Sequence, residues 1–173
     1  MKFRLISRVL GIGLIAFSFL QLTPIIVSII YNEDNIAAFA YSFLITLAFG
    51  SFLYLVNFER KYEGIRVKEG FLLTVLLWLF FTIFATLPLI FGTKSGLTIV
   101  SAYFEATSGL TTTGATIFSD LSGEYYSILF YRGLLQWIGG LGIIVLAIAL
   151  MPLLGVGGMQ LYRGETQGPI NQS

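Results

Sequence analysis

The segment SGLTTTGAT, Ser108–Thr116, concentrates groups that can bind a cation, with four threonines around the single Gly114. Glycine adopts dihedral angles that bring successive backbone carbonyls toward one axis, and rings of such carbonyls replace the hydration shell of K⁺ in potassium channels. Threonine favours extended backbone and adds a hydroxyl oxygen. The segment is therefore a candidate wall of a cation-selectivity filter.

A second interpretation of the same residues is structural. Clusters of serine, threonine and glycine also form packing turns between membrane helices, and the chain would then be a non-conducting helical assembly or scaffold module. The filter hypothesis requires the carbonyls of Thr111–Ala115 to converge on a cavity. The scaffold hypothesis lets that backbone pack against protein, and the sequence leaves both open.

The composition places the chain in a lipid bilayer. Hydrophobic residues make up 56% of its 173 positions and charged residues 11%, whereas about a quarter of a soluble domain is charged. It has no cysteine and no histidine, which excludes disulfides, thiolate or imidazole metal sites, and catalysis by Ser-His or Cys-His pairs. The remaining candidate acid/base groups are carboxylates with no paired partner in the predicted core, so we expect neither an enzyme nor a cofactor.

Four uncharged apolar runs reach the roughly 20 residues that cross a bilayer as a helix. They are Val9–Tyr31, Ile36–Phe58, Gly70–Gly92 and Gly133–Leu154. The first follows a basic start, MKFRLISR, but is longer than the apolar part of a signal peptide and lacks a cleavage site, so we expect a retained anchor. We expect kinks, and no chemistry, at three prolines: Pro24, Pro88 and Pro152.

Lysine and arginine predict the orientation, because cytoplasmic loops are enriched in both. With four crossings, eight basic residues share one side of the membrane and only Lys94 and Arg132 lie near the other. The eight are Lys2, Arg4, Arg8, Arg60, Lys61, Arg66, Lys68 and Arg163. Both termini are therefore expected in the cytoplasm.

The segment Leu97–Leu110 is helix-like but, at about 14 residues, is short for a span and typical of a re-entrant element. It contains Glu105, which must be enclosed by protein or face water. The carbonyl end of this short helix favours a cation. We therefore predict an all-α integral membrane fold of four transmembrane helices, a re-entrant pore helix and an extended filter loop. Residues 1–60 would form a hairpin and residues 66–160 a helix, pore loop and helix.

Glu105 lies nine residues before Gly114 and is a candidate support for the loop. It would bind backbone N–H groups or a cationic partner, and Arg132 is the basic residue expected at a similar depth. The alternative is an interfacial carboxylate that reaches water. Gly139, Gly140 and Gly142 similarly allow two interpretations, close helix packing or a bend that gates the pathway.

Two segments carry a resemblance to a known family: YFEATSGLTTTGAT and LFYRGLLQWIGGLGIIVLAIALMPLLGVGGMQLYRGET. Their residues and spacing resemble the first pore-forming repeat of the membrane subunit of Trk-type potassium uptake systems. These belong to the Trk/Ktr/HKT superfamily. The resemblance covers essentially the whole chain, because the Trk branch carries an extra hairpin before its first repeat. It implies four such repeats in one polypeptide around a pseudo-fourfold axis. It also implies that any gating elements lie mainly in later repeats.

The resemblance implies roles for five positions. Gly114 matches the filter glycine, and Thr112 and Thr113 match the residues whose carbonyls bind K⁺, bordered by Thr111 and Ala115. The chain would supply one quarter of a filter. We therefore expect a fragment of a four-repeat potassium transporter, with self-assembly of four copies as the alternative.

The resemblance also implies partners and a location. Besides K⁺ and lipid, these are the three remaining repeats or further subunits, a homodimer of the full protein, and a cytoplasmic nucleotide-binding regulatory subunit. Residues 161–173 would contact that subunit or serve as a cytoplasmic tail or linker. The location implied is the bacterial inner membrane. The chain has no nucleotide-binding loop of its own, since GVGGM lacks the required spacing, and no nucleic acid is expected.

Overall fold

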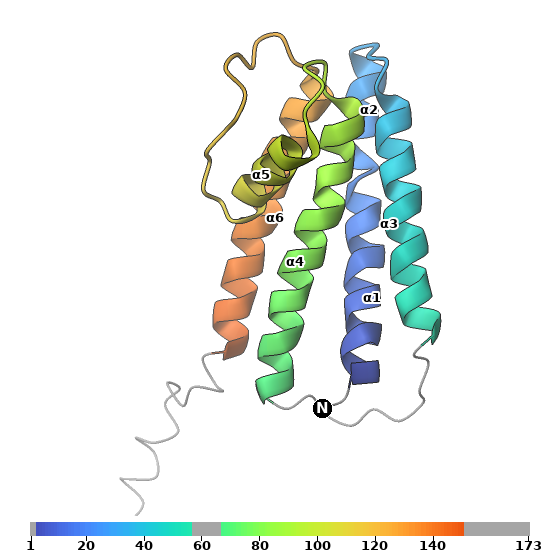
Figure 1. The fold of residues 1–173 in the computed structure, drawn as a ribbon, viewed down its shortest axis with the longest axis vertical. Coiled ribbons are helices and arrows are strands. Elements are labelled where there is room, and N and C mark those ends of the chain that lie inside the picture. Colours follow the sequence, from blue (N-terminus) through green and yellow to red (C-terminus); the bar gives the residue numbers. More distant parts are fainter. Residues whose placement is uncertain (1–2, 57–66, 151–173) are drawn as a thin grey trace, which may run out of the picture. The chain divides into compact units, whose positions relative to one another are not determined.

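The computed structural model describes residues 3–56 and 67–150 of the 173, and within these ranges every regular element is a helix. The helices are α1 (Phe3–Leu20), α2 (Thr23–Ile30), α3 (Ile36–Val56), α4 (Val67–Gly92), α5 (Ile99–Leu110) and α6 (Tyr126–Leu150). In this part of the chain, four helical segments are long and apolar enough to cross a membrane. The predicted all-α membrane fold is confirmed (Figure 1).

The first predicted span, Val9–Tyr31, is not one continuous helix, because it is interrupted between α1 and α2. Pro24 has no N–H to donate to the carbonyl of Leu20, four residues earlier. The hydroxyl of Thr23 donates to that carbonyl instead, at 2.8 Å. The proline therefore breaks the helix, and the span continues as α2.

The last span begins at Tyr126 and not at the predicted Gly133. The prediction was wrong because Arg132 interrupts the uncharged run, although the arginine lies inside the helix. The carboxylate of Glu33 accepts the first two backbone N–H groups, Tyr126 N at 2.6 Å and Ser127 N at 3.1 Å. A carboxylate at this position stabilises a helix N-terminus. Helix α4, which contains the third span, begins at Val67, three residues before the predicted Gly70. The predicted ends of the second and fourth spans and the tail 161–173 lie outside the described residues.

Among the described residues, those up to Gly140 belong to one compact unit, and residues 141–150 belong to a second. In the first unit, α1 packs closely on α3 and both pack on α4. The core between them includes Phe17, which stacks on Phe81 with 4.8 Å between ring centroids. The N-terminal hairpin is thus packed on the first long helix of the pore-loop segment.

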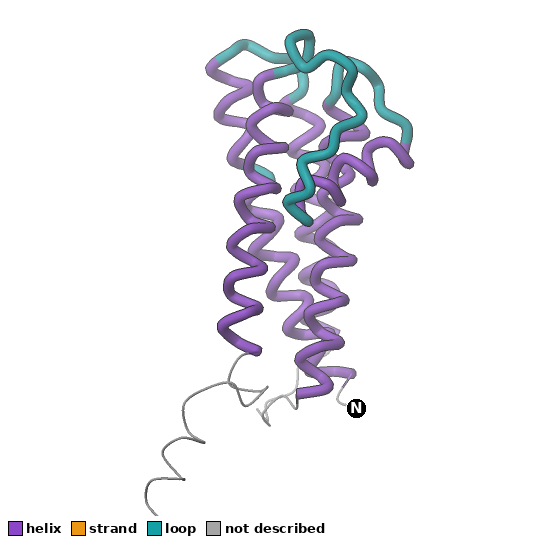
Figure 2. The backbone as a smooth tube through the Cα atoms, turned by 90° about the vertical axis from the view of Figure 1, so that its left-hand side faces the viewer, coloured by secondary structure: helices purple, strands orange, loops and turns teal. Residues whose placement is uncertain are grey.

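Helix α5 enters the first unit and does not cross it. A carboxylate at the outer end, Glu124, accepts from the backbone N–H groups of Lys94 and Ser95 ahead of α5. The other end of α5 contacts Gly139, thirteen residues into α6 or roughly 20 Å along its axis. The chain then returns to Tyr126 as an irregular loop (Figures 1 and 2). This confirms the re-entrant helix and extended loop.

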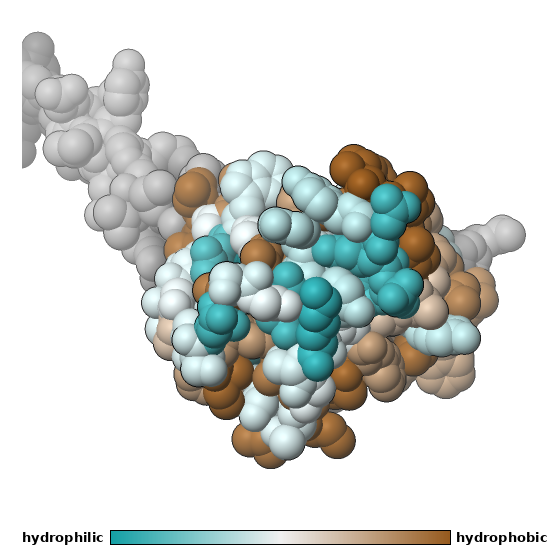
Figure 3. All heavy atoms as spheres, turned by 90° about the horizontal axis from the view of Figure 1, so that it is seen from above, coloured by the Kyte–Doolittle hydropathy of each residue, from teal (hydrophilic) through white to brown (hydrophobic). Residues whose placement is uncertain are grey.

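The end of the first unit that carries the loops is polar. Seen onto this end, hydrophilic residues gather on the face and apolar residues lie at its margin (Figure 3). In the loop, the Ser122 hydroxyl, and then its backbone N–H, lower the pKa of Asp120. Asp120 therefore keeps its negative charge at neutral pH. A polar end with a charged carboxylate is consistent with the expectation that this end of the unit faces water.

Close packing of α1 on α3 gives a first prediction. A Cβ at Gly11 would lie 2.7 Å from the carbonyl oxygen of Gly50 and 2.8 Å from the backbone nitrogen of Tyr54. Gly11→Ala should therefore destabilise the protein by about 1–3 kcal/mol, measured by thermal unfolding in detergent. Gly13→Ala is the matched control, because its Cβ would meet mainly the movable end of the Leu77 side chain. Equal losses in both variants would contradict this packing.

Candidate functional site

The chain leaves α5 through a tight helix-ending turn. Thr112 N donates to Gly109 O at 3.0 Å, and Thr113 N donates to Ser108 O at 2.9 Å, which is the Schellman pattern. The turn requires a left-handed residue, and Thr112 adopts φ +56°. This position usually holds glycine, and a β-branched residue there is strained by roughly 1–3 kcal/mol. Strain is therefore stored at one of the two threonines predicted to bind K⁺.

The next residues expose unpaired backbone. Within the described part of the chain, no group donates a hydrogen bond to the carbonyls of Thr111, Thr112, Thr113 or Gly114. All four residues are exposed. Gly114 adopts φ +75°, and nothing lies within 4 Å of the Cβ position. Four consecutive carbonyl oxygens are thus available to a ligand, at a depth where backbone groups need a partner.

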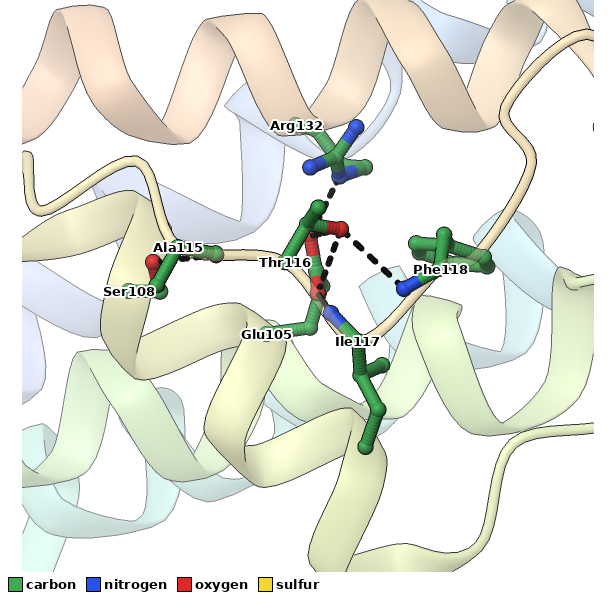
Figure 4. A network of polar contacts seen from close by, with 7 residues as sticks. All are labelled: Glu105, Ser108, Ala115, Thr116, Ile117, Phe118 and Arg132. Carbon is green, nitrogen blue, oxygen red and sulfur yellow. Dashed lines mark hydrogen bonds and ion pairs between the residues drawn. The ribbon is translucent and has the colours of Figure 1, made fainter.

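The segment of the loop that follows its apex, residues 115–117, is hydrogen-bonded to side chains of α5 (Figure 4). The Ser108 hydroxyl donates to the carbonyl of Ala115 at 2.6 Å. One turn earlier on α5, the Glu105 carboxylate accepts from the backbone N–H of Ile117 at 3.0 Å and from the Thr116 hydroxyl at 3.2 Å. The apex of the loop is therefore free, whereas its return is fixed to α5.

The same carboxylate joins α6. Arg132 Nε donates to Glu105 Oε1 at 2.5 Å, and the two side chains are 15% and 2% exposed. The guanidinium also lies over the ring of Phe118, with 5.3 Å to the centroid. The buried Glu105 carboxylate thus connects the re-entrant helix α5, the loop segment 115–117 and the following helix α6. The sequence predicted this pairing, and the structure places the two residues in contact.

Gly139 allows the end of α5 to approach α6. A Cβ at this position would lie 2.0 Å from the carbonyl oxygen of Leu110, the last residue of α5. On the opposing face, a Cβ at Gly109 would lie 3.1 Å from Leu135 Cβ. Of the two interpretations of this glycine cluster, the contacts at Gly139 support close packing. Gly142 lies in the second compact unit.

Ser108 was missed by sequence reasoning, as was the contribution of Thr116. The available signal was spacing, because residues three apart lie on one face of a helix and Ser108 follows Glu105 by three. What the sequence did not contain is the turn that folds Ala115 back onto that face. The ion-binding roles of Thr112, Thr113 and Gly114 stay predictions.

The family model of TrkH, described as a cation transport protein, matches residues 35–173. The chain belongs to the TrkH family. The Trk system potassium uptake protein TrkH of Escherichia coli K12 is 47% identical over the whole chain, which covers 36% of that relative. TrkG of the same organism is 38% identical over 169 residues, with 34% of that protein covered. The chain thus spans about a third of the length of these curated relatives.

A solved structure agrees with the fold. The crystal structure of the potassium transporter TrkH from Vibrio parahaemolyticus matches 92% of this chain and 34% of its own, with a TM-score of 0.85 and 40% sequence identity. The predicted resemblance to Trk-type membrane subunits is therefore confirmed for this TrkH-family chain. The two chains share their fold over the matched residues.

The ion pair behind the loop gives a second prediction. Glu105→Gln leaves Arg132 without its carboxylate, and Arg132→Gln leaves the buried Glu105 unpaired. Each change should cost about 3 kcal/mol or more of unfolding free energy, and the double variant should cost less than the sum of the two. The measurement is denaturant unfolding of the purified protein, with the exposed Asp120→Asn as control. Additive losses would show that the two side chains do not interact.

Proposed function

We propose that this chain supplies one wall of a carbonyl-lined K⁺ pathway and takes part in potassium uptake across a membrane. The observation that supports this most directly is the run of unpaired carbonyls at Thr111–Gly114. K⁺ enters a dehydrated site only where oxygens replace its water. Thr112 and Thr113 are the residues whose carbonyls we assign to K⁺, with Gly114 giving the loop its curvature. The chain acts in transport and not in catalysis.

The scaffold alternative fits these contacts less well. In a packing turn, the backbone groups would form hydrogen bonds with neighbouring protein, as the loop segment 115–117 does with Ser108 and Glu105. The apex differs, since its carbonyls have no donor in the described part of the chain and Gly114 has open space around it. A loop that is fixed along its return and free at its apex is suited to holding a ligand.

One loop does not enclose an ion, because K⁺ needs oxygens on all sides. The curated relatives are about three times longer than this chain, so we propose that further pore loops complete the ring in the assembled protein. Four copies of this chain are the other means of closing it. We also propose that the full protein forms a homodimer and binds a cytoplasmic nucleotide-binding regulatory subunit. We propose an inner-membrane location with both termini in the cytoplasm.

The third prediction tests the filter. The full reading frame that encodes this chain is expressed in a potassium-uptake-deficient bacterial host, and growth and ion uptake are measured at low K⁺. Gly114→Ser forces a side chain onto φ +75° without a steric clash. It should reduce the preference for K⁺ over Na⁺ by about tenfold or more, since a strain of 1–3 kcal/mol acts directly on the site.

Gly96→Ser is the matched control, because Gly96 also adopts a positive φ, +62°, with nothing within 4 Å of its Cβ position. It lies in the turn before α5, beside the end of the loop that Glu124 holds and not at the Thr111–Gly114 apex, and should leave ion preference unchanged. Failure of the unaltered protein to restore growth would sink the proposed function. So would equal ion preference in Gly114→Ser and the unaltered protein.

A further inference from the structure

Helix α4 contains a backbone defect that other helices repair. Pro88 has no N–H, so the carbonyl of Phe84, four residues earlier, loses its helical donor. Gln21 Nε2 donates to this carbonyl at 3.1 Å. The glutamine is completely buried and lies at the break between α1 and α2. The interruption of the first span thus places a side-chain amide at the interruption of the third.

Two more helices meet at this point. The single hydroxyl proton of Thr46 on α3 is shared between the carbonyl of Ser42, at 2.7 Å, and Gln21 Oε1, at 3.1 Å. Tyr131 on α6 donates its hydroxyl to the carbonyl of Ala85 at 3.1 Å and is 1% exposed. The Pro88 defect is therefore a buried polar junction between the N-terminal hairpin, α4 and α6. Gln21 and Tyr131 each contact the backbone of α4 from another helical segment.

The hairpin also holds the outer ends of α4 and α6. Asn35 Nδ2 donates to the carbonyl of Gly92 at 3.2 Å and to the Ser127 hydroxyl at 2.8 Å, while its carbonyl oxygen accepts from Ser28 at 2.8 Å. Glu33 caps the first amides of α6. The turn between α2 and α3 thus joins the end of α4 to the start of α6.

These contacts set the rotation of α6. Successive helical residues are turned by about 100°, so Tyr131 faces α4 while its neighbour Arg132 faces Glu105. A rotation of α6 that displaced the tyrosine would also displace the arginine from the carboxylate that holds the filter loop. Polar contacts between membrane helices fix such rotations because unsatisfied groups are costly there.

We propose that the N-terminal hairpin is a positioning element for the filter, with Gln21 as its central residue. Gln21 holds the Pro88 defect of α4, α4 holds Tyr131, and Tyr131 keeps Arg132 on Glu105. The proposal rests on the proposed potassium transport for its readout. A purely structural Gln21 would affect the amount of folded protein and the maximal rate together, whereas a positioning residue changes KM and ion preference.

The test is Gln21→Leu in the full-length transporter, with K⁺ uptake measured against K⁺ concentration and normalised to the amount of protein in the membrane. We expect a rise in KM for K⁺, or a fall in K⁺ over Na⁺ preference, of about fivefold, the effect of losing one buried hydrogen bond. Tyr131→Phe removes only the hydroxyl and should act in the same direction. Thr82→Val is the control, since that hydroxyl bonds only within α4.

A second variant isolates the defect itself. In Pro88→Ala, the new backbone N–H can donate to the Phe84 carbonyl, so the glutamine is no longer needed there. Gln21→Leu should then change KM and ion preference by less than twofold on the Pro88→Ala background. An equal effect of Gln21→Leu on both backgrounds would contradict the proposed junction.

The outcomes separate the two proposals. Failure of the unaltered protein to transport K⁺ contradicts the proposed function. Normal transport by the unaltered protein, with unchanged KM and ion preference in both Gln21→Leu and Tyr131→Phe, contradicts the positioning role alone. If Gln21→Leu is not produced, Tyr131→Phe decides, because it removes a single oxygen from the same junction.

Discussion

The arrangement of this chain follows from one constraint, that backbone N–H and C=O groups inside a bilayer must find partners within the protein. Pro24 removes one donor, and the neighbouring Thr23 hydroxyl compensates locally. Pro88 removes another, and compensation comes from Gln21 on a different helix. The irregular loop after α5 poses the largest demand, and the buried Glu105 carboxylate meets part of it by accepting from Ile117 while binding Arg132.

The carbonyls of Thr111–Gly114 are the exception to this constraint, and the surrounding contacts explain how the exception persists. The Schellman turn holds Thr112 in a left-handed conformation that it would not adopt alone. Ser108 and Glu105 fix the loop segment 115–117 by hydrogen bonds. Gly139 allows α6 to pack closely against the end of α5. Strain, free carbonyls and rigid support occur together, as expected where a loop is shaped for a ligand and not for its own stability.

Much of this architecture could be predicted from the sequence, because hydrophobic length and the cost of burying a charge are local properties. They indicated the four spans, the short helix and the enclosure of Glu105 by protein. The start of α6 was missed because a buried, paired Arg132 looks like the end of a span, and the break after α1 was missed because a proline inside a helix breaks or only kinks it according to context. Ser108, Gln21 and Tyr131 act through residues 7, 63 and 46 positions away, which no periodicity encodes.

The central claim is that the carbonyls of Thr112 and Thr113 bind the transported ion. It is tested most directly by a structure of the complete transporter in Tl⁺, an electron-dense substitute for K⁺, with the ion located by its anomalous scattering. We expect a Tl⁺ peak in coordination contact with both carbonyl oxygens, lost when Na⁺ replaces Tl⁺. The assignment of the ion to Thr112 and Thr113 is contradicted if their carbonyls pack against protein with no ion beside them while Tl⁺ binds elsewhere.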